Sequence, residues 1–77
     1  MEIKNAIVRA EKIHTLLYAI EAVQERRMVM AVKLLRALTG LSVREAAASI
    51  TIACGEEPQG EVSEGAKEVG LLLKKFL

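Results

Sequence analysis

The stretch Lys33-Leu-Leu-Arg-Ala-Leu-Thr-Gly-Leu-Ser-Val-Arg-Glu-Ala46 predicts the end of one helix, a tight turn and the start of a second helix. Gly40 suits the position just past a helix end, where a positive φ is favoured. Leu41 supplies the apolar side chain that commonly folds back onto the last turn. Ser42 and Glu45 have the spacing of a capping box, in which each side chain accepts a hydrogen bond from the other residue's backbone N–H. We therefore expect a firmly held helix pair.

The sequence before this pair has the periodicity of a long amphipathic helix over residues 1–25. Its apolar residues recur at spacings of three and four, as on one helix face: Ile3, Ile7, Ala10, Ile13, Leu17 and Ile20. The polar run at 24–27 predicts a break, although no glycine or proline marks it. The alternative is one helix that continues to residue 38, which is unusually long for a compact domain.

Residues 28–54 are expected to form the helix-turn-helix, and residues 62–77 a C-terminal helix that begins at the N-cap candidate Ser63. A loop at 55–61 separates them. Gly65 and Gly70 inside the last helix suggest that it is buried on more than one side or pressed closely on a neighbour. The sequence thus predicts a single all-α domain, 1–77, of three or four helices. The β-branched run at 50–54 leaves an α+β fold as the alternative.

Length and composition favour self-association. A chain of 77 residues builds a core that supplies only about 3–5 kcal/mol, and small chains often gain stability by oligomerising. Hydrophobic residues make up 52% of the sequence, yet only Tyr18 and Phe76 are aromatic. Such aliphatic content suits helices packed along continuous stripes. We therefore expect a homo-oligomer, and we assign residues 1–25 as the dimerisation helix.

Net charge, cysteine content and the lengths of apolar runs indicate which ligands and which cellular compartment suit this sequence. The formal net charge is +1, so no strong field draws nucleic acid or anionic lipid. The single cysteine, Cys54, cannot form a disulfide within the chain. No apolar run approaches the length of a membrane span, and charges interrupt the N-terminus where a secretory signal would lie. We expect a cytoplasmic protein that does not enter membranes.

The sequence contains no residue pattern that is typical of an enzyme active site. The only histidine, His14, lies four residues before Tyr18, a spacing that favours a packing pair. No glycine-rich phosphate loop follows a strand. We therefore predict a protein that is not an enzyme, with no catalytic residue, metal or cofactor.

Basic residues gather around the second helix and suggest a binding surface. Lys33, Arg36 and Arg44 would pair with acidic groups of a partner protein, and Leu41 or Val32 would supply an apolar anchor. The leading expectation is a small adaptor or regulator that binds another protein through this basic face. One alternative is a nucleic-acid-binding helix-turn-helix, although the alanines after Ser42 offer few groups that read bases. Another is a purely structural helical oligomer.

The pattern Lys33-x-x-Arg36-x-x-Thr39-Gly40-Leu41-x-Val43-Arg44-Glu45-Ala46 resembles the helix-turn-helix unit of the C-terminal domain of ribosomal stalk protein L7/L12. The resemblance extends over about residues 28–77 and is specific only over 33–46. It implies a protein-docking surface that uses Lys33 and Arg36, with Arg44 and Glu45 beside them and Val32 as an apolar contact. In that family the helix pair recruits translational GTPases.

This sequence departs from the family pattern in several respects. The family domain is α/β, with a strand before this unit and another after the last helix. Here the residues before the unit have a helical pattern, and the sequence given ends where the last strand would begin. Ser42 replaces the second glycine of the family motif, and Met28 stands where a basic residue is usual. These differences put the sheet and the family's function in doubt.

Overall fold

The computed structural model describes residues 3–77 and contains four α-helices. They are α1 (Ile3–Gln24), α2 (Met28–Thr39), α3 (Val43–Ala53) and α4 (Glu64–Lys74). No strand occurs among the described residues, so the predicted all-α fold is confirmed. The α+β alternative is wrong because α3 remains helical through residues 50–53 and then stops at Gly55, which has φ 80°.

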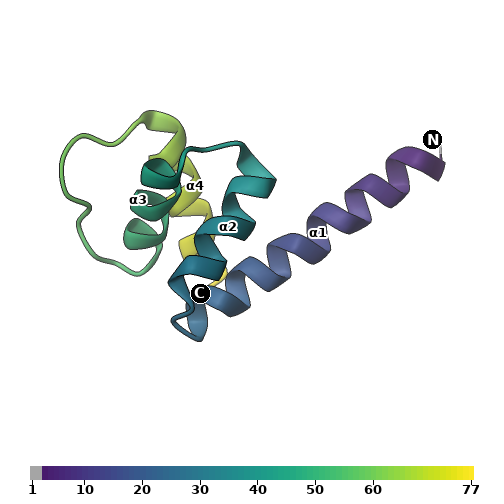
Figure 1. The fold of residues 1–77 in the computed structure, drawn as a ribbon, viewed down its shortest axis with the longest axis horizontal. Helices are drawn as coiled ribbons and strands as arrows, with labels where there is room; N and C mark the ends of the chain where they lie inside the picture. The colour runs from purple at the N-terminus through teal and green to yellow at the C-terminus, as the bar shows by residue number, and fades with distance from the viewer. Residues whose placement is uncertain (1–2) are drawn as a thin grey trace.

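The helices form two packed pairs, and the pairs contact each other through α2 and α3 (Figure 1). α1 packs against α2, and α3 packs against α4. The N-terminal half of α1 extends away from the other three helices, which gives the molecule an elongated outline of 42 × 25 × 20 Å. The segment between α3 and α4 is a wide loop on the far side of α3 from α1.

The break after α1 lies within the polar run 24–27. Arg26 has φ 63°, in the left-handed region that glycine usually occupies. Its N–H donates to the Val23 carbonyl at 3.1 Å, and the Arg27 N–H donates to the Ala22 carbonyl at 2.8 Å. These two bonds form a Schellman motif, which satisfies carbonyls that the end of the helix leaves without partners. An arginine here therefore stops α1 without any glycine or proline.

The turn between α2 and α3 has the predicted chemistry. Gly40 adopts φ 76°, and its N–H donates to the Arg36 carbonyl at 2.8 Å. The capping box is complete: the Glu45 N–H donates to Ser42 Oγ at 3.1 Å, and the Ser42 N–H donates to Glu45 Oε1 at 3.2 Å. Leu41 is half-buried and packs against the core.

The core is built largely from small and aliphatic side chains on all four helices. Among the α1 side chains that the structure describes, those that contribute to the core come from the C-terminal half, and Ile13 and Leu17 remain 60% and 58% exposed. Ile13 and Leu17 stay exposed because α2 is too short to cover the whole of α1: the 12 residues of α2 span about 18 Å, whereas the 22 residues of α1 span about 33 Å. The buried apolar residues are Ala19, Ile20, Ala22, Val23, Ala31, Leu35, Ala46, Ile50, Ala53, Ala66 and Leu73.

α3 and α4 approach each other closely at two residues without large side chains. A Cβ added at Gly70 would lie 2.8 Å from both Ile52 Cβ and the Ser49 carbonyl oxygen. The buried Ser49 hydroxyl donates to the Ala66 carbonyl across the interface at 2.7 Å. The predicted close approach therefore holds at Gly70, whereas Gly65 faces open space.

Candidate functional site

The outer face of α2 carries a shallow groove, here called the α2 groove. Its apolar lining includes Val29, which is 86% exposed, and Val43 from the first turn of α3, which is 56% exposed. Lys33 and Arg36 are three residues apart on α2 and therefore lie on the same side of the helix. Met28 and Val32 complete the lining. The groove thus combines exposed aliphatic surface with two cations.

Neither cation has an acidic partner among the side chains that the structure describes. Among the described side chains, no carboxylate forms an ion pair with Lys33 or Arg36, and both residues are exposed. Arg36 Nε donates to the Leu41 carbonyl at 3.2 Å, which holds the guanidinium beside the turn. Arg36 is therefore partly ordered before any partner binds, and its remaining N–H donors are available.

Leu41 and Val32, which the sequence suggests as apolar anchors, are not the most exposed apolar residues on this side of the molecule. Leu41 and Val32 are half-buried and pack against the core, so much of their surface is already covered. The more exposed apolar groups of the α2 groove are Val29 and Val43. Val43 lies three residues before Ala46 and seven before Ile50, so its spacing alone does not separate it from these buried residues of α3. Its exposure follows from the turn, which places the first residue of α3 at the edge of α2.

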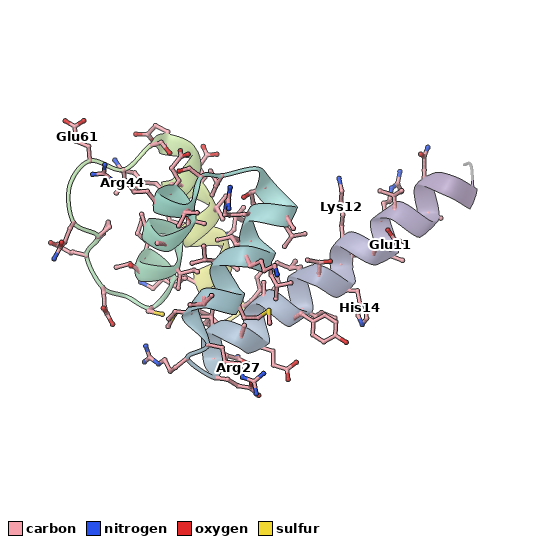
Figure 2. The ribbon with its side chains drawn as sticks, in the orientation of Figure 1. Glu11, Lys12, His14, Arg27, Arg44 and Glu61 are labelled. Carbon is pink, nitrogen blue, oxygen red and sulfur yellow. The ribbon has the colours of Figure 1, made fainter. Side chains whose placement is uncertain are left out.

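Arg44 lies apart from Lys33 and Arg36. It lines a second hollow between α3 and the loop that follows it, together with Glu61. Its Nη2 atom lies 3.5 Å from the position of a Cβ at Gly60, and Figure 2 shows the side chain at the loop beside Glu61. The structure therefore brings Val32, Lys33 and Arg36 into one groove and places Arg44 and Glu45 in the other hollow.

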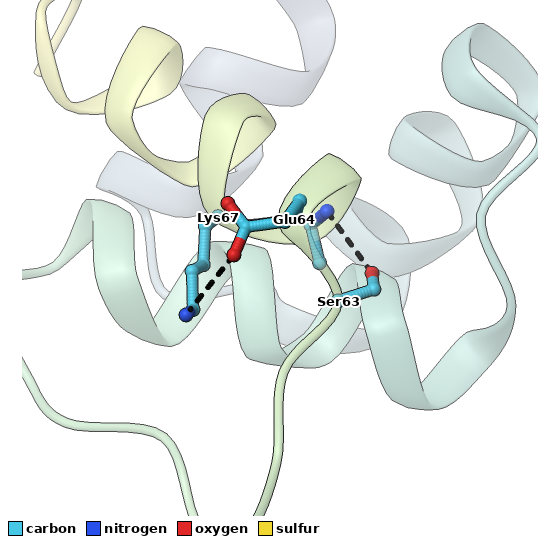
Figure 3. Close-up of polar contacts among 4 residues, drawn as sticks. Ser63, Glu64 and Lys67 are labelled. Carbon is cyan, nitrogen blue, oxygen red and sulfur yellow. Dashed lines mark hydrogen bonds and ion pairs between the residues drawn. The ribbon is translucent and has the colours of Figure 1, made fainter.

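Glu45 connects the first turns of two helices. Its Oε1 atom accepts the capping-box bond from Ser42, and its Oε2 atom accepts a bond from the Ser63 hydroxyl at 2.7 Å. Ser63 is the N-cap of α4 and accepts from the Ala66 N–H at 3.2 Å, while Lys67 and Glu64 pair at 3.6 Å in the turn that follows (Figure 3). Hydrogen bonds from Ser63 and then Ser42 lower the pKa of Glu45 below its ordinary value of 4.5. Glu45 is therefore a structural joint between α3 and α4.

The other residues considered from the sequence do not assemble into a reactive site. The rings of His14 and Tyr18 pack at a tilt of 54°, with centroids 4.7 Å apart, on the exposed surface of α1. Cys54 is a half-buried free thiol at the end of α3. Within residues 3–77, no three acidic, histidine or cysteine side chains gather as a metal site would require. No helix in this part of the chain has the length and apolar composition needed to cross a bilayer.

The α2 groove offers exposed apolar surface beside two cations. Its exposed valines can be desolvated by an apolar side chain, and its two cations can pair with carboxylates at the rim. Comparison with known protein families, curated proteins and solved structures finds no match for this chain.

Proposed function

We propose that this chain is a small non-enzymatic adaptor or regulator that binds another protein through the α2 groove. The observation that carries the proposal is the pairing of exposed valines with Lys33 and Arg36, which lack acidic partners among the described residues. Val29 is 86% exposed, so a partner that covers it removes apolar surface from water, which favours association. The resemblance to the L7/L12 helix-turn-helix unit supports the same use of Lys33 and Arg36.

The partner expected here presents acidic residues beside an apolar side chain. Lys33 and Arg36 are exposed among the residues that line the groove, and opposite charges on a partner would speed association with them and select among partners. The valines would carry more of the binding free energy where the partner desolvates them fully. A short amphipathic helix with carboxylates along one edge has this chemistry.

Affinity capture from host lysate tests the proposal. The bait is the wild-type chain, and the test variant is the double charge reversal Lys33→Glu/Arg36→Glu. A matched control, Lys74→Glu/Lys75→Glu, makes the same change in net charge at the end of α4. All three baits are first compared by circular dichroism, because Arg36→Glu also removes the hydrogen bond to the Leu41 carbonyl. The proposal predicts a protein that the wild type and the control capture and that the α2-groove variant loses.

The same experiment distinguishes the alternatives. Capture that disappears after nuclease treatment and weakens steeply with salt would favour the nucleic-acid-binding helix-turn-helix. Equal capture by all three baits would assign binding to another surface. Capture of nothing by any bait, at concentrations where weak complexes form, would favour a purely structural oligomer.

A further inference from the structure

A second apolar surface lies apart from the α2 groove and shares no lining residue with it. This groove, here called the α1–α4 groove, is lined by residues of α1 and α4 and by Leu35, Leu38 and Thr39 of α2. Except for Lys12 and Thr39, the side chains that line it are apolar. The most exposed of these are Ile13 of α1, Leu72 of α4 and Phe76 just after α4, at 60%, 55% and 57%. Leu17, at 58%, lies one turn from Ile13 on the same face of α1 and extends this surface.

The exposed part of α1 continues a stripe whose C-terminal part is already buried. Ala6, Ala10, Ile13, Leu17 and Ile20 follow alternating spacings of four and three, which is the heptad pattern of a helix that pairs with another helix. Ile20 is buried in the chain's own core, but the other four residues of this stripe are exposed. The first turns of α1 project beyond the other three helices (Figure 1). A helical segment of this length is marginal in water without a packing partner.

We propose that a second copy of this chain covers the α1–α4 groove, with the two α1 helices antiparallel and crossing near Ile13 and Leu17. In this arrangement the projecting half of each α1 lies along Leu72 and Phe76 of the other copy. The contact is isologous, because each α1 is both the covering helix and one wall of the groove.

The exposed area matches what a stable dimer needs. Four large side chains that are each more than half exposed leave roughly 400 Å² of apolar surface, on the order of 100 Å² apiece. A standard interface buries about 800 Å² per partner, of which just over half is apolar. The small side chains of Ala6 and Ala10 add to this area and allow close helix approach.

The charges of α1 favour the antiparallel orientation. Arg9 and Lys12 lie in the projecting half, whereas Glu21 is the one charged residue of the packed half. An antiparallel pair sets the basic half of one helix beside the acidic half of the other, and a parallel pair would oppose like charges. Glu11 is the one acidic residue of the projecting half after residue 2, and it lies on the side of α1 away from the heptad stripe.

The sedimentation mass of the full chain tests the dimer, with neighbouring leucines of α4 as a matched pair. Leu71 and Leu72 are 56% and 55% exposed, but only Leu72 lines the groove. At tens of micromolar, we expect the wild type and Leu71→Glu to sediment at twice 8.4 kDa and Leu72→Glu at the monomer mass. A monomeric wild type, or equal behaviour of the two variants, would overturn the proposal. Circular dichroism of both variants shows whether either has unfolded.

Distances between spin labels test the orientation, in a Cys54→Ser background. In the proposed dimer, labels at His14→Cys lie close to each other across the two-fold axis, whereas labels at Asn5→Cys are about 30 Å apart. A parallel pair would bring both positions close, and a different interface would separate the labels at residue 14. The α1–α4 groove shares no residue with the α2 groove. The dimer and the proposed partner binding can therefore fail independently.

Discussion

Ser63, the N-cap of α4, donates its hydroxyl hydrogen to the carboxylate of Glu45, the third residue of α3, at 2.7 Å. The bond joins residues 18 apart in sequence, and the loop between α3 and α4 lies between them. Because Glu45 also completes the capping box with Ser42, one carboxylate holds the start of α3 and positions the start of α4. Its negative charge is also favourable near two helix N-termini.

We predict that this joint makes stability depend on pH in the acid range. The hydrogen bonds from Ser63 and Ser42 lower the pKa of Glu45 in the folded state, so the ionised carboxylate stabilises the fold. That contribution is complete above the ordinary value of 4.5 and is lost as the pH falls through the lower folded value. The melting temperature of Glu45→Gln should therefore lie below that of the wild type at neutral pH, and the difference should shrink in acid. Glu57→Gln, a loop variant with the same charge loss, is the control; a difference that grows in acid would contradict the prediction.

Replacement of Arg26 by glycine should stabilise the protein. A non-glycine residue in the left-handed region destabilises the fold by roughly 1–2 kcal/mol. Glycine removes this strain, but its greater conformational freedom in the unfolded chain offsets part of the gain. We expect a net gain of about 0.5–1 kcal/mol in the free energy of unfolding by urea. Arg27→Gly, at the next residue with φ −86°, should show no gain. A loss of stability in Arg26→Gly would mean that the Schellman turn is not strained.

The two glycines of α4 should respond in opposite directions to alanine. Gly70→Ala places a Cβ against Ile52 and the Ser49 carbonyl and should destabilise the fold by about 1–3 kcal/mol. Gly65→Ala meets no atom and should stabilise the helix by up to about 1 kcal/mol. Urea unfolding of both variants checks the pair. Equal effects would show that α3 and α4 are not closely packed at Gly70.

Local signals made much of this fold predictable. Gly40, Ser42 and Glu45 act within one turn of one another, so their spacing alone indicates the joint between α2 and α3. Ser63 is recognisable as an N-cap for the same reason, although its bond to Glu45 depends on the tertiary fold. The break at Arg26 is harder to predict because arginine rarely adopts a positive φ. The β-branched run at 50–54 is helical because Ile50 and Ala53 are buried on the face that packs in the core.

The candidate site was predictable only in part. Lys33 and Arg36 share a groove because their spacing places them on one helix face. The separation of Arg44 depends on the path of the loop before α4, which residues 55–61 do not encode in their spacing. The exposure of Ile13 and Leu17 depends on how far α2 extends along α1. Periodicity identifies an apolar face but does not say whether the same chain covers it.

The most direct test of the central claim is site-specific photo-cross-linking from the α2 groove. A photoreactive amino acid replaces Val29, the most exposed apolar residue of the groove, and in a matched variant it replaces Leu71 on α4. The account predicts an adduct with one partner protein from residue 29, none with that protein from residue 71, and loss of the adduct in Lys33→Glu/Arg36→Glu. Adduct formation that is equal from both positions, or that persists after the charge reversal, would contradict it.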